Sequence, residues 1–260
     1  MGSEVEHKIP VIDLSEEKDL KPGSDSCVLA CKKVRYAMEE YGCFEIVCDK
    51  FPPELRNSIF GAAKDLFDLP KETKMKKITD RPSALGYVAE HPKHPRYETL
   101  GINNGVFDSI KESSFHILQF FKYRTPQSDE SDLSLGLSAH KDSAHITIIH
   151  QHHVGGLRIK TKDGQWIFDV KHSSSSFVVL AGYVLMAWCN DRIFACEHQV
   201  SIRDQNETRY SVGLITYTKG ILNVPEELVD DKHPLRYKPI DSFGFKIFRL
   251  SEEGSKSACL

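Results

Sequence analysis

Two histidines and one aspartate have the residue types and the spacing of a metal site. His140 and Asp142 lie two positions apart in a segment that we expect to be extended, so their side chains leave the same face of a strand. His198 follows fifty-eight positions later, in another strand-like run. Two imidazoles and one carboxylate on adjoining strands form a facial triad that suits ferrous iron and leaves other metal positions open. An H-x-D pattern alone also describes a surface histidine beside an aspartate in a turn, so the hypothesis needs a second signal.

Arg209 and Ser211 supply that second signal. They lie eleven and thirteen positions after His198 and share one face of an expected strand. A guanidinium group offers two parallel donors to a carboxylate, and a hydroxyl adds a third. One end of a dicarboxylic 2-oxo acid requires such a site while its other end chelates iron. The alternative is that Arg209 is a surface residue paired with Glu207 or Asp204, but the order and spacing of the two motifs together favour the 2-oxo acid site.

Other metal-binding residue types are present without a matching pattern. Cys27 and Cys31 lie four apart on an expected helix, but no second Cys or His pair has the spacing of a zinc site. We therefore interpret the seven cysteines as free thiols of a reducing cytosol. A second metal site is an open alternative for four crowded histidines, although no cysteine or carboxylate joins them and we favour satisfied or exposed side chains; they are His145, His150, His152 and His153.

Apolar periodicity predicts the elements that must position these residues. The N-terminal third reads as an extended segment, two helices with a strand between them, a basic helical turn and an irregular loop; the ranges are 9–14, 24–41, 43–47, 53–69, 71–77 and 82–95. Strand-like runs then follow at short intervals, at 116–123, 133–139, 145–150, 156–160, 165–170, 177–180, 184–189, 193–201 and 209–218. Many short strands predict a mainly β fold, a sandwich or barrel with flanking helices.

Composition excludes several classes of function. The chain has 260 residues and a net charge of −3, so no basic field indicates nucleic acid or a membrane surface as a partner. The longest apolar run, Phe177–Trp188, is shorter than the ~20 residues of a membrane helix, and we interpret it as buried strands. The first 21 residues lack the apolar stretch of a secretory signal. We expect a cytoplasmic monomer whose partner is a small molecule.

Further motifs give the chain a family resemblance over nearly its whole length. Ile9–Leu14 resembles an I-P-x-I-D-L start, 41–46 a Y-G-F-F-x strand, and 69–74 an L-P-x-E-x-K turn; Gly86-Tyr87, 135–140, Gly156-Leu157 and 163–167 match as well. Together with the H-x-D, His and R-x-S motifs, they are similar to those of plant 2-oxoglutarate- and Fe(II)-dependent dioxygenases. The tail at 227–239 looks most like the branch that includes the glucosinolate side-chain dioxygenases and deoxypodophyllotoxin synthase.

The resemblance implies a fold, a chemistry and a set of roles. The core would be a double-stranded β-helix, or jelly roll. His140, Asp142 and His198 would bind Fe(II), and Arg209 and Ser211 would bind 2-oxoglutarate. Tyr123 would be a second contact to the 2-oxo acid, or else a packed strand tyrosine. No catalytic residue beyond the metal centre is implied.

The implied reaction is the oxidation of a small plant specialised metabolite by O2, coupled to formation of succinate and CO2, with ascorbate in support. Hydroxylation, desaturation, ring closure or demethylation could result. We expect the N-terminal segment, the strand faces near the metal and the tail around Phe243–Phe248 to line the substrate pocket.

The resemblance also divides the chain into three parts. Residues 1–106 would be an N-terminal helical and extended region, 107–218 the double-stranded β-helix core with the Fe(II) and 2-oxoglutarate site, and 219–260 a C-terminal wrapping extension. Two turns depart from the family pattern: Gly182-Tyr183 replaces Gly-Asp, and Asn190-Asp191-Arg192 replaces Asn-Gly-Arg. Both precede His198 and could shift it.

The larger departure is an apparent internal deletion between about Gly101 and Tyr123. The family usually carries long helices there, and the shortfall is roughly 40 residues, or about three average helices. Their loss predicts an exposed apolar sheet face. The alternative function is therefore a catalytically impaired or inactive family member that binds a 2-oxo acid or a metabolite.

Overall fold

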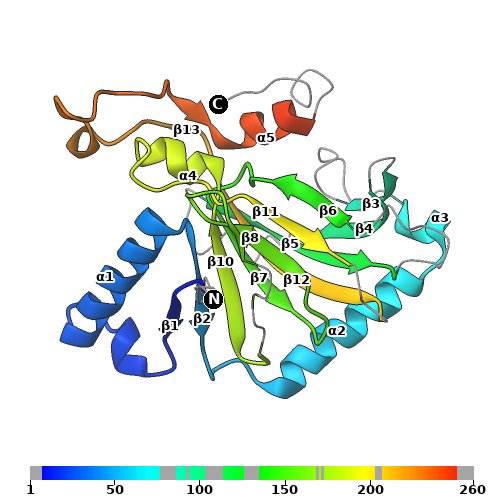
Figure 1. Ribbon diagram of the computed structural model, residues 1–260. Coiled ribbons are helices and arrows are strands. Elements are labelled where there is room, and N and C mark those ends of the chain that lie inside the picture. The colour runs from blue at the N-terminus through cyan, green and yellow to red at the C-terminus, as the bar shows by residue number, and fades with distance from the viewer. Residues whose placement is uncertain are drawn as a thin grey trace, which may run out of the picture.

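The computed structural model describes residues 8–76, 86–91, 94–102, 114–125, 135–167, 170, 173–202 and 207–250. Two β-sheets face each other, and helices lie on the outside (Figure 1). The helices are α1 (Asp25–Glu40), α2 (Pro53–Asp68), α3 (Lys71–Lys74), α4 (Tyr183–Trp188) and α5 (Ser242–Leu250), with 3-10 turns η1 (Glu17–Leu20) and η3 (Glu226–Leu228). This arrangement confirms the expected mainly β, jelly-roll fold with flanking helices.

The larger sheet has eight strands in the order β1-β2-β10-β7-β12-β5-β4-β3. Their bounds are β1 (Val11–Asp13), β2 (Cys43–Val47), β10 (Ser176–Ala181), β7 (Ile146–Gln151), β12 (Arg209–Thr218), β5 (Ser114–Tyr123), β4 (His94–Ile102) and β3 (Gly86–His91). All neighbours are antiparallel except β1 and β2. Long β12 lies at the centre, between β5 and β7, and it carries Arg209 and Ser211.

The smaller sheet has four strands in the order β6-β11-β8-β9. They are β6 (Leu135–His140), β11 (His198–Ser201), β8 (Leu157–Lys160) and β9 (Trp166–Ile167), and a separate two-stranded ribbon pairs β13 (Ile221–Leu222) with β14 (Ile240–Asp241). Leu157 and Ile159 of the smaller sheet pack against Val178 and Leu180 of the larger sheet. Alternate residues of each strand therefore form one core between the sheets, as the period of two requires.

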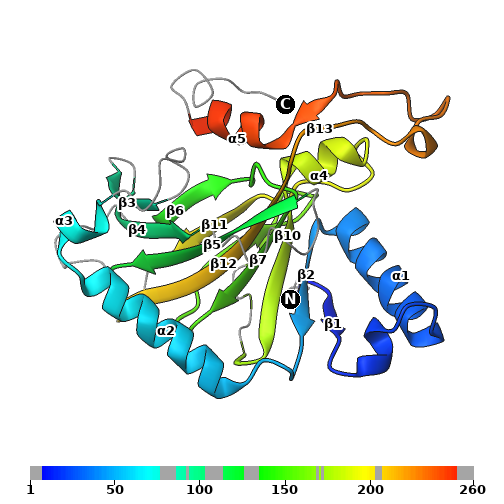
Figure 2. The same ribbon diagram turned by 180° about the vertical axis from the view of Figure 1, so that it is seen from behind.

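Two helices cover parts of the outer face of the larger sheet, as Figures 1 and 2 show from opposite sides. Ser24 caps α1 because its side chain accepts a hydrogen bond from the Cys27 N–H, and Ala37 and Met38 of this helix pack on the β2–β10 region. Phe60 and Phe67 of α2 pack with Val212 of β12. Both helices lie within about a residue of their predicted bounds.

Three elements differ from the prediction. Residues 183–188 form the helix α4 where we expected a strand, because a short apolar run does not distinguish a buried strand from a buried helix. Residues 86–91 and 94–102 form paired strands at the edge of the larger sheet, although prolines predicted a loop at 82–95 and no element was predicted at 96–102. Strand β11 begins only at His198, so 193–197 is not a strand. Residues 77–85, 92–93, 103–113, 126–134 and 168–169, which carry parts of several predicted elements, lie outside the described residues.

The outer face of the larger sheet retains a groove between the regions that α1 and α2 cover. It has a volume of about 450 Å³, and its lining is almost wholly apolar, including Leu14, Ile46, Ile59, Leu118, Ile148 and Leu214. An exposed apolar sheet face was predicted from the apparent deletion between Gly101 and Tyr123. The structure shows such a face, while residues 103–113 of the segment between Gly101 and Tyr123 lie outside the described residues.

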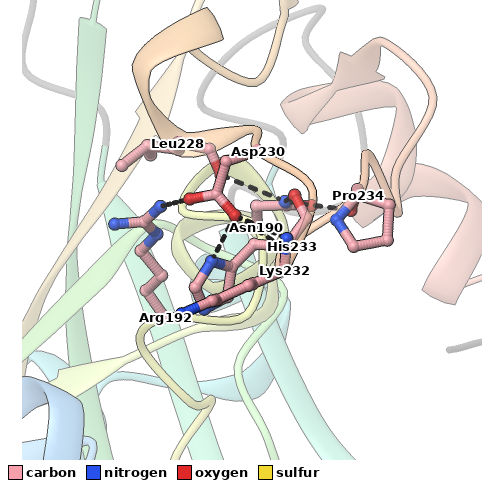
Figure 3. A network of polar contacts seen from close by, with 7 residues as sticks. All are labelled: Asn190, Arg192, Leu228, Asp230, Lys232, His233 and Pro234. Carbon is pink, nitrogen blue, oxygen red and sulfur yellow. Dashed lines mark hydrogen bonds and ion pairs between the residues drawn. The ribbon is translucent and has the colours of Figure 1, made fainter.

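The C-terminal segment after β12 returns along α4, where the side-chain amide of Asn190 binds its backbone (Figure 3). Asn190 Nδ2 lies 3.2–3.3 Å from the carbonyl oxygens of Leu228, His233 and Pro234. Asn190 Oδ1 accepts from the Arg236 N–H at 3.0 Å. The tail is therefore attached to the core at Asn190. Its last described element is α5, which lies beside the end of the sandwich that holds β6 (Figures 1 and 2).

Candidate functional site

The three predicted metal ligands meet at one end of the two sheets. His140 ends β6 and pairs directly with His198, which begins β11. Asp142 follows β6 by two residues, so its carboxylate lies 3.6 Å from His140 Nε2 and 4.0 Å from His198 Nε2. One ligand atom from each residue lies within 4.8 Å of the others, and no other group of three such side chains occurs within the described ranges. The geometry suits a divalent metal held by two imidazoles and one carboxylate.

Hydrogen bonds to the backbone orient both imidazoles. His140 Nδ1 lies 2.8 Å from the Ser138 carbonyl, and His198 Nδ1 lies 3.2 Å from the Cys196 carbonyl. A carbonyl only accepts, so each Nδ1 carries the proton and each Nε2 keeps its lone pair for a metal. Thr147 of β7 donates to Asp142 Oδ2 over 2.5 Å and fixes the carboxylate. The orientation of all three side chains is therefore set before any metal binds.

Charge at the site favours the ligating forms of Asp142 and His198. Burial alone would raise the pKa of Asp142, but the charges of His198 and His140 and the Thr147 hydrogen bond hold it well below its usual range. Burial and the charge of His140 lower the pKa of His198 to about 4. Burial also opposes the charge on His140, yet the hydrogen bond and charge of Asp142 raise its pKa. An ionised carboxylate beside a neutral imidazole is the donor set that a cation requires.

The predicted 2-oxo acid residues lie together deeper between the sheets. Arg209 is 1% exposed, which excludes the surface pairing that we considered for it. Its Nη1 donates to Ser211 Oγ at 3.0 Å, and its Nη2 donates to Gln151 Oε1 at 2.8 Å. The guanidinium carbon lies 4.9 Å from the ring centre of Tyr123. Burial raises the pKa of Tyr123 to about 12, so its hydroxyl stays protonated and can donate.

Two buried donors in this cluster have no partner in the protein. Arg209 Nε and Gln151 Nε2 are both buried and make no hydrogen bond. A buried donor that makes no hydrogen bond destabilises the folded protein by roughly 1–3 kcal/mol. Such donors therefore usually face a ligand. A cavity of about 150 Å³ adjoins both the triad and this cluster; its lining includes His140, Asp142, His198, Arg209, Ser211 and Tyr123. An anion that accepts from these donors and reaches the metal fits both observations.

Sequence reasoning missed several residues of the cavity. Thr147 lines the cavity from β7, and Gln151 of the same strand contacts Arg209. The alternation of Thr147, Ile149 and Gln151 along β7 is the signal that could have found them. From the tail, Lys246 lines the cavity within the expected range 243–248. From the predicted N-terminal region 1–106, Tyr97 lines the cavity.

The four crowded histidines lie apart from the triad. His150 is bonded to the Ser176 carbonyl and to Arg56 on the outer face of β7, and the ring of His152 packs on Phe60. His153 pairs with Glu207, and His145 faces Trp188. His152 Nδ1 is buried without a hydrogen-bond partner, but the one metal cluster among the described residues includes none of the four histidines, which favours packed or bonded side chains over a second metal site.

The two turns that depart from the family pattern, at Gly182-Tyr183 and at 190–192, keep the backbone conformation that the fold requires. A Cβ on Gly182 would lie 2.1 Å from the Ala144 carbonyl oxygen, so no other residue fits there. The next N–H, that of Tyr183, donates to the Asp142 carbonyl at 2.8 Å, a contact that needs no aspartate side chain. Asn190 and Asp191 have φ of 52° and 65°, which costs a residue with a Cβ more than glycine. Asp191 offsets this strain by accepting from Arg236 and Tyr237 of the tail.

Comparisons with known proteins match this site. The model of the 2OG-Fe(II) oxygenase superfamily matches residues 115–216, and that of the non-haem dioxygenase in morphine synthesis N-terminal region matches 9–114. The chain is 34% identical to the probable 2-oxoglutarate-dependent dioxygenase AOP1 of Arabidopsis thaliana, over 96% of this chain and 93% of the relative. It is 25% identical to a probable inactive 2-oxoglutarate-dependent dioxygenase AOP2 of the same plant, over 96% and 95% of the two chains.

A solved structure has the same fold. The Neurospora crassa T7H in complex with alpha-KG and 5-formyluracil superposes with a TM-score of 0.81 at 22% identity, and the match covers 96% of this chain and 97% of that chain. The alignment with AOP1 spans 308 positions, whereas the matched 96% of this chain is about 250 residues. More than fifty positions of that relative therefore have no counterpart here, which agrees with a shortened chain.

No helix among the described residues is both long and apolar enough to span a membrane. The two family matches together extend over most of the sequence and include all three clustered ligands as well as Arg209. The chain accordingly belongs to the 2OG-Fe(II) oxygenase superfamily and is a 2-oxoglutarate-dependent dioxygenase.

Proposed function

We propose that the protein oxidises a small plant metabolite at an Fe(II) ion held by His140, Asp142 and His198. When bound, the iron supplies the chemistry that couples oxidation by O2 to the conversion of 2-oxoglutarate into succinate and CO2. The observation that carries the proposal is that Arg209 and Ser211 line one cavity with the triad, and that this cluster holds two partnerless donors, Arg209 Nε and Gln151 Nε2. They are the complement of a carboxylate whose other end reaches the metal.

The chain's own residues would bind and orient the co-substrate. Arg209 and Ser211 would hold the distal carboxylate of 2-oxoglutarate, and the protonated hydroxyl of Tyr123 would donate to the same molecule. The desolvated guanidinium group binds an anion more strongly than an exposed one, because water competes less. Leu137, Ile149 and Val200 line the same cavity and would keep it dry. Outcomes within reach are hydroxylation, desaturation, ring closure or demethylation, with ascorbate in support.

The full chain should release succinate from 2-oxoglutarate only with Fe(II) and a suitable plant metabolite. We expect Arg209→Ala to abolish this release, because the variant removes the carboxylate donors and leaves Gln151 unpaired. Turnover in Arg209→Ala equal to that of the wild type would contradict the assignment of the co-substrate site. We further propose a cytoplasmic monomer, which sedimentation of the purified chain and localisation of a tagged chain would test.

The second candidate is an impaired binder, because the described part of the chain leaves an apolar groove open on the larger sheet. A thermal melt separates the two. A cooperative transition that shifts upward with Fe(II) and 2-oxoglutarate indicates a stable, ligand-binding fold. A shift without succinate release from any tested metabolite would favour the binder.

A further inference from the structure

The helix α5 presents two positive charges to the metal end of the cavity. Lys246 and Arg249 are three residues apart, so they lie on one face of the helix. Lys246 lines the cavity that holds the triad. The guanidinium carbon of Arg249 lies 5.9 Å from the ring centre of Tyr183, on the same side of the helix. In a chain of net charge −3, two cations therefore lie close together beside the metal end of the cavity.

Packing on both sides holds α5 in this position. Phe243 packs against Phe115 of β5 and Tyr217 of β12, with ring centres 5.2 and 6.3 Å apart. Phe245 packs against Tyr183 of α4 at 6.2 Å. Asp241 caps the helix by accepting from the N–H groups of Phe243 and Gly244. Lys246 therefore extends from a supported element rather than from a free tail.

The ammonium group of Lys246 has a polar anchor but no counter-charge. Its Nζ donates to Tyr217 Oη at 2.5 Å and lies 4.6 Å from the centre of that ring. Within the described ranges, no carboxylate lies within ion-pair distance of Lys246, and Tyr217 is its one side-chain hydrogen-bond partner. Burial lowers the pKa of Lys246 to about 8, although the more distant charge of Asp142 opposes this. A partly buried cation without a partner is stabilised by any anion that enters the cavity.

The two cationic side chains of the cavity serve different ends of it. Arg209 begins β12 and Tyr217 lies near its end, eight residues further along. At ~3.3 Å per residue, their Cα atoms are on the order of 26 Å apart. Thr147, which donates to Asp142, pairs with Ile215 of β12, so the triad lies towards the Tyr217 end of this strand. Lys246 is bonded to Tyr217 and therefore belongs to the triad end of the cavity, whereas Arg209 belongs to the opposite end. The triad end is the end at which an organic substrate would approach the metal.

We propose that Lys246 is a specificity-determining residue that binds an oxyanion, a carboxylate or a sulfate, on the organic substrate, with Arg249 as a second positive charge close by. This inference rests on the proposed function, because it places the second reactant beside the metal of that same site. The substrate class is then a small organic acid whose oxidised carbon lies close to its charged group. The hydroxyl of Tyr217 accepts a hydrogen bond from the ammonium group and so holds it in position.

Paired probes test the proposal by equilibrium dialysis against the full chain, with and without Mn(II) and 2-oxoglutarate. The pairs are phenylacetate with phenylacetamide, cinnamate with cinnamamide, and phenyl sulfate with phenol. We expect at least one acid to bind tenfold more tightly than its neutral partner, a difference of about 1.4 kcal/mol. The carboxylate and sulfate arms then show which oxyanion the site prefers.

Variants assign the preference to one side chain. We expect Lys246→Met to lose at least tenfold in acid affinity while the neutral probes are unaffected, and Lys246→Arg to retain acid binding within about threefold. The exposed Lys219→Met, which keeps the net charge of the first variant, should behave as the wild type. Circular dichroism and a thermal melt of each variant show that it is folded.

Equal affinity for acids and neutral partners, unchanged acid binding in Lys246→Met, or no acid binding at about 10 mM, well above a weak Kd of ~1 mM, would overturn the proposal. A parallel loss of 2-oxoglutarate affinity in Lys246→Met would also overturn it, since Lys246 would then belong to the co-substrate site. If 2-oxoglutarate and Mn(II) fail to bind the wild type, the proposed function fails. The dialysis without them still decides whether Lys246 selects acids.

Discussion

The guanidinium group of Arg209 donates a hydrogen bond to Gln151 Oε1 over 2.8 Å, across the neighbouring strands β12 and β7. Both side chains are almost fully buried, and each keeps one donor without a protein partner. This contact orients the guanidinium group of Arg209, which lines the cavity. We therefore include Gln151 in the proposed 2-oxo acid site.

Replacing Gln151 with leucine keeps the volume and removes the acceptor and its free donor. We expect Gln151→Leu to weaken 2-oxoglutarate binding about tenfold, because the guanidinium loses its orientation and the ligand loses one donor. Calorimetric titration in the presence of Mn(II) measures the Kd. Gln165→Leu, an exposed site in a turn, is the matched control. An unaltered Kd in Gln151→Leu would remove this residue from the site.

Thr147 tests the hydrogen bond that fixes the metal carboxylate. Thr147→Val is nearly isosteric but cannot donate to Asp142, so the carboxylate is free to rotate. Loss of such an outer contact typically lowers metal affinity ~10–100-fold. Competition with a fluorescent chelator measures the metal affinity of the variant. Thr216→Val alters an outward-facing threonine of the same larger sheet, bonded to His116, and should leave metal affinity intact. Equal affinities of both variants would contradict the role of Thr147.

Gly182 tests the close packing behind the triad. An added Cβ would meet the Ala144 carbonyl at 2.1 Å, and the adjacent N–H holds the Asp142 carbonyl. We expect Gly182→Ala to lower the free energy of unfolding by about 3 kcal/mol and to weaken metal binding. Gly61→Ala, in open space on α2, should raise stability by ~0.5–1 kcal/mol. Urea denaturation measures both, and a stable Gly182→Ala would show that the turn can shift without cost.

The lowered pKa of His152 predicts that the folded protein loses stability at acid pH. Burial, then the charges of His153 and Arg56, lower its pKa to about 4 from an ordinary 6.5. The unfolded chain therefore takes up this proton first, so the stability that His152 contributes is complete above pH 6.5 and is lost as pH falls towards 4. Partial exposure limits the loss to about 1 kcal/mol. His152→Phe, which keeps the stacking on Phe60, should show a shallower pH slope, and identical slopes would refute the assignment.

Much of the site could be predicted because its pattern is local or repeats along strands. H-x-D and R-x-S each place two side chains on one strand face, and the structure brings both pairs into one cavity. Period-two alternation also gave β12 with its bounds. Asp191 was an anomaly in sequence, and only the fold shows the tail residues that compensate for its positive φ.

Other features depend on contacts that no local pattern contains. The apolar run at 183–188 fits a helix as well as a strand, and burial among other elements decides between them. The prolines near β3 and β4 favoured the prediction of a loop, but strands at the edge of a sheet also tolerate proline. Lys246 reaches the cavity only because α5 packs against Tyr183 and Tyr217, which are far away in the chain. Such long-range placement is not encoded in spacing.

The central claim is that this shortened chain keeps a complete Fe(II) and 2-oxoglutarate site. Calorimetric titration of the purified full chain with 2-oxoglutarate, with and without Mn(II), tests it most directly. We expect one site per chain that requires the metal and disappears in both His198→Ala and Arg209→Ala. Binding that ignores the metal, that persists in either variant, or that is absent from a folded wild type would contradict it.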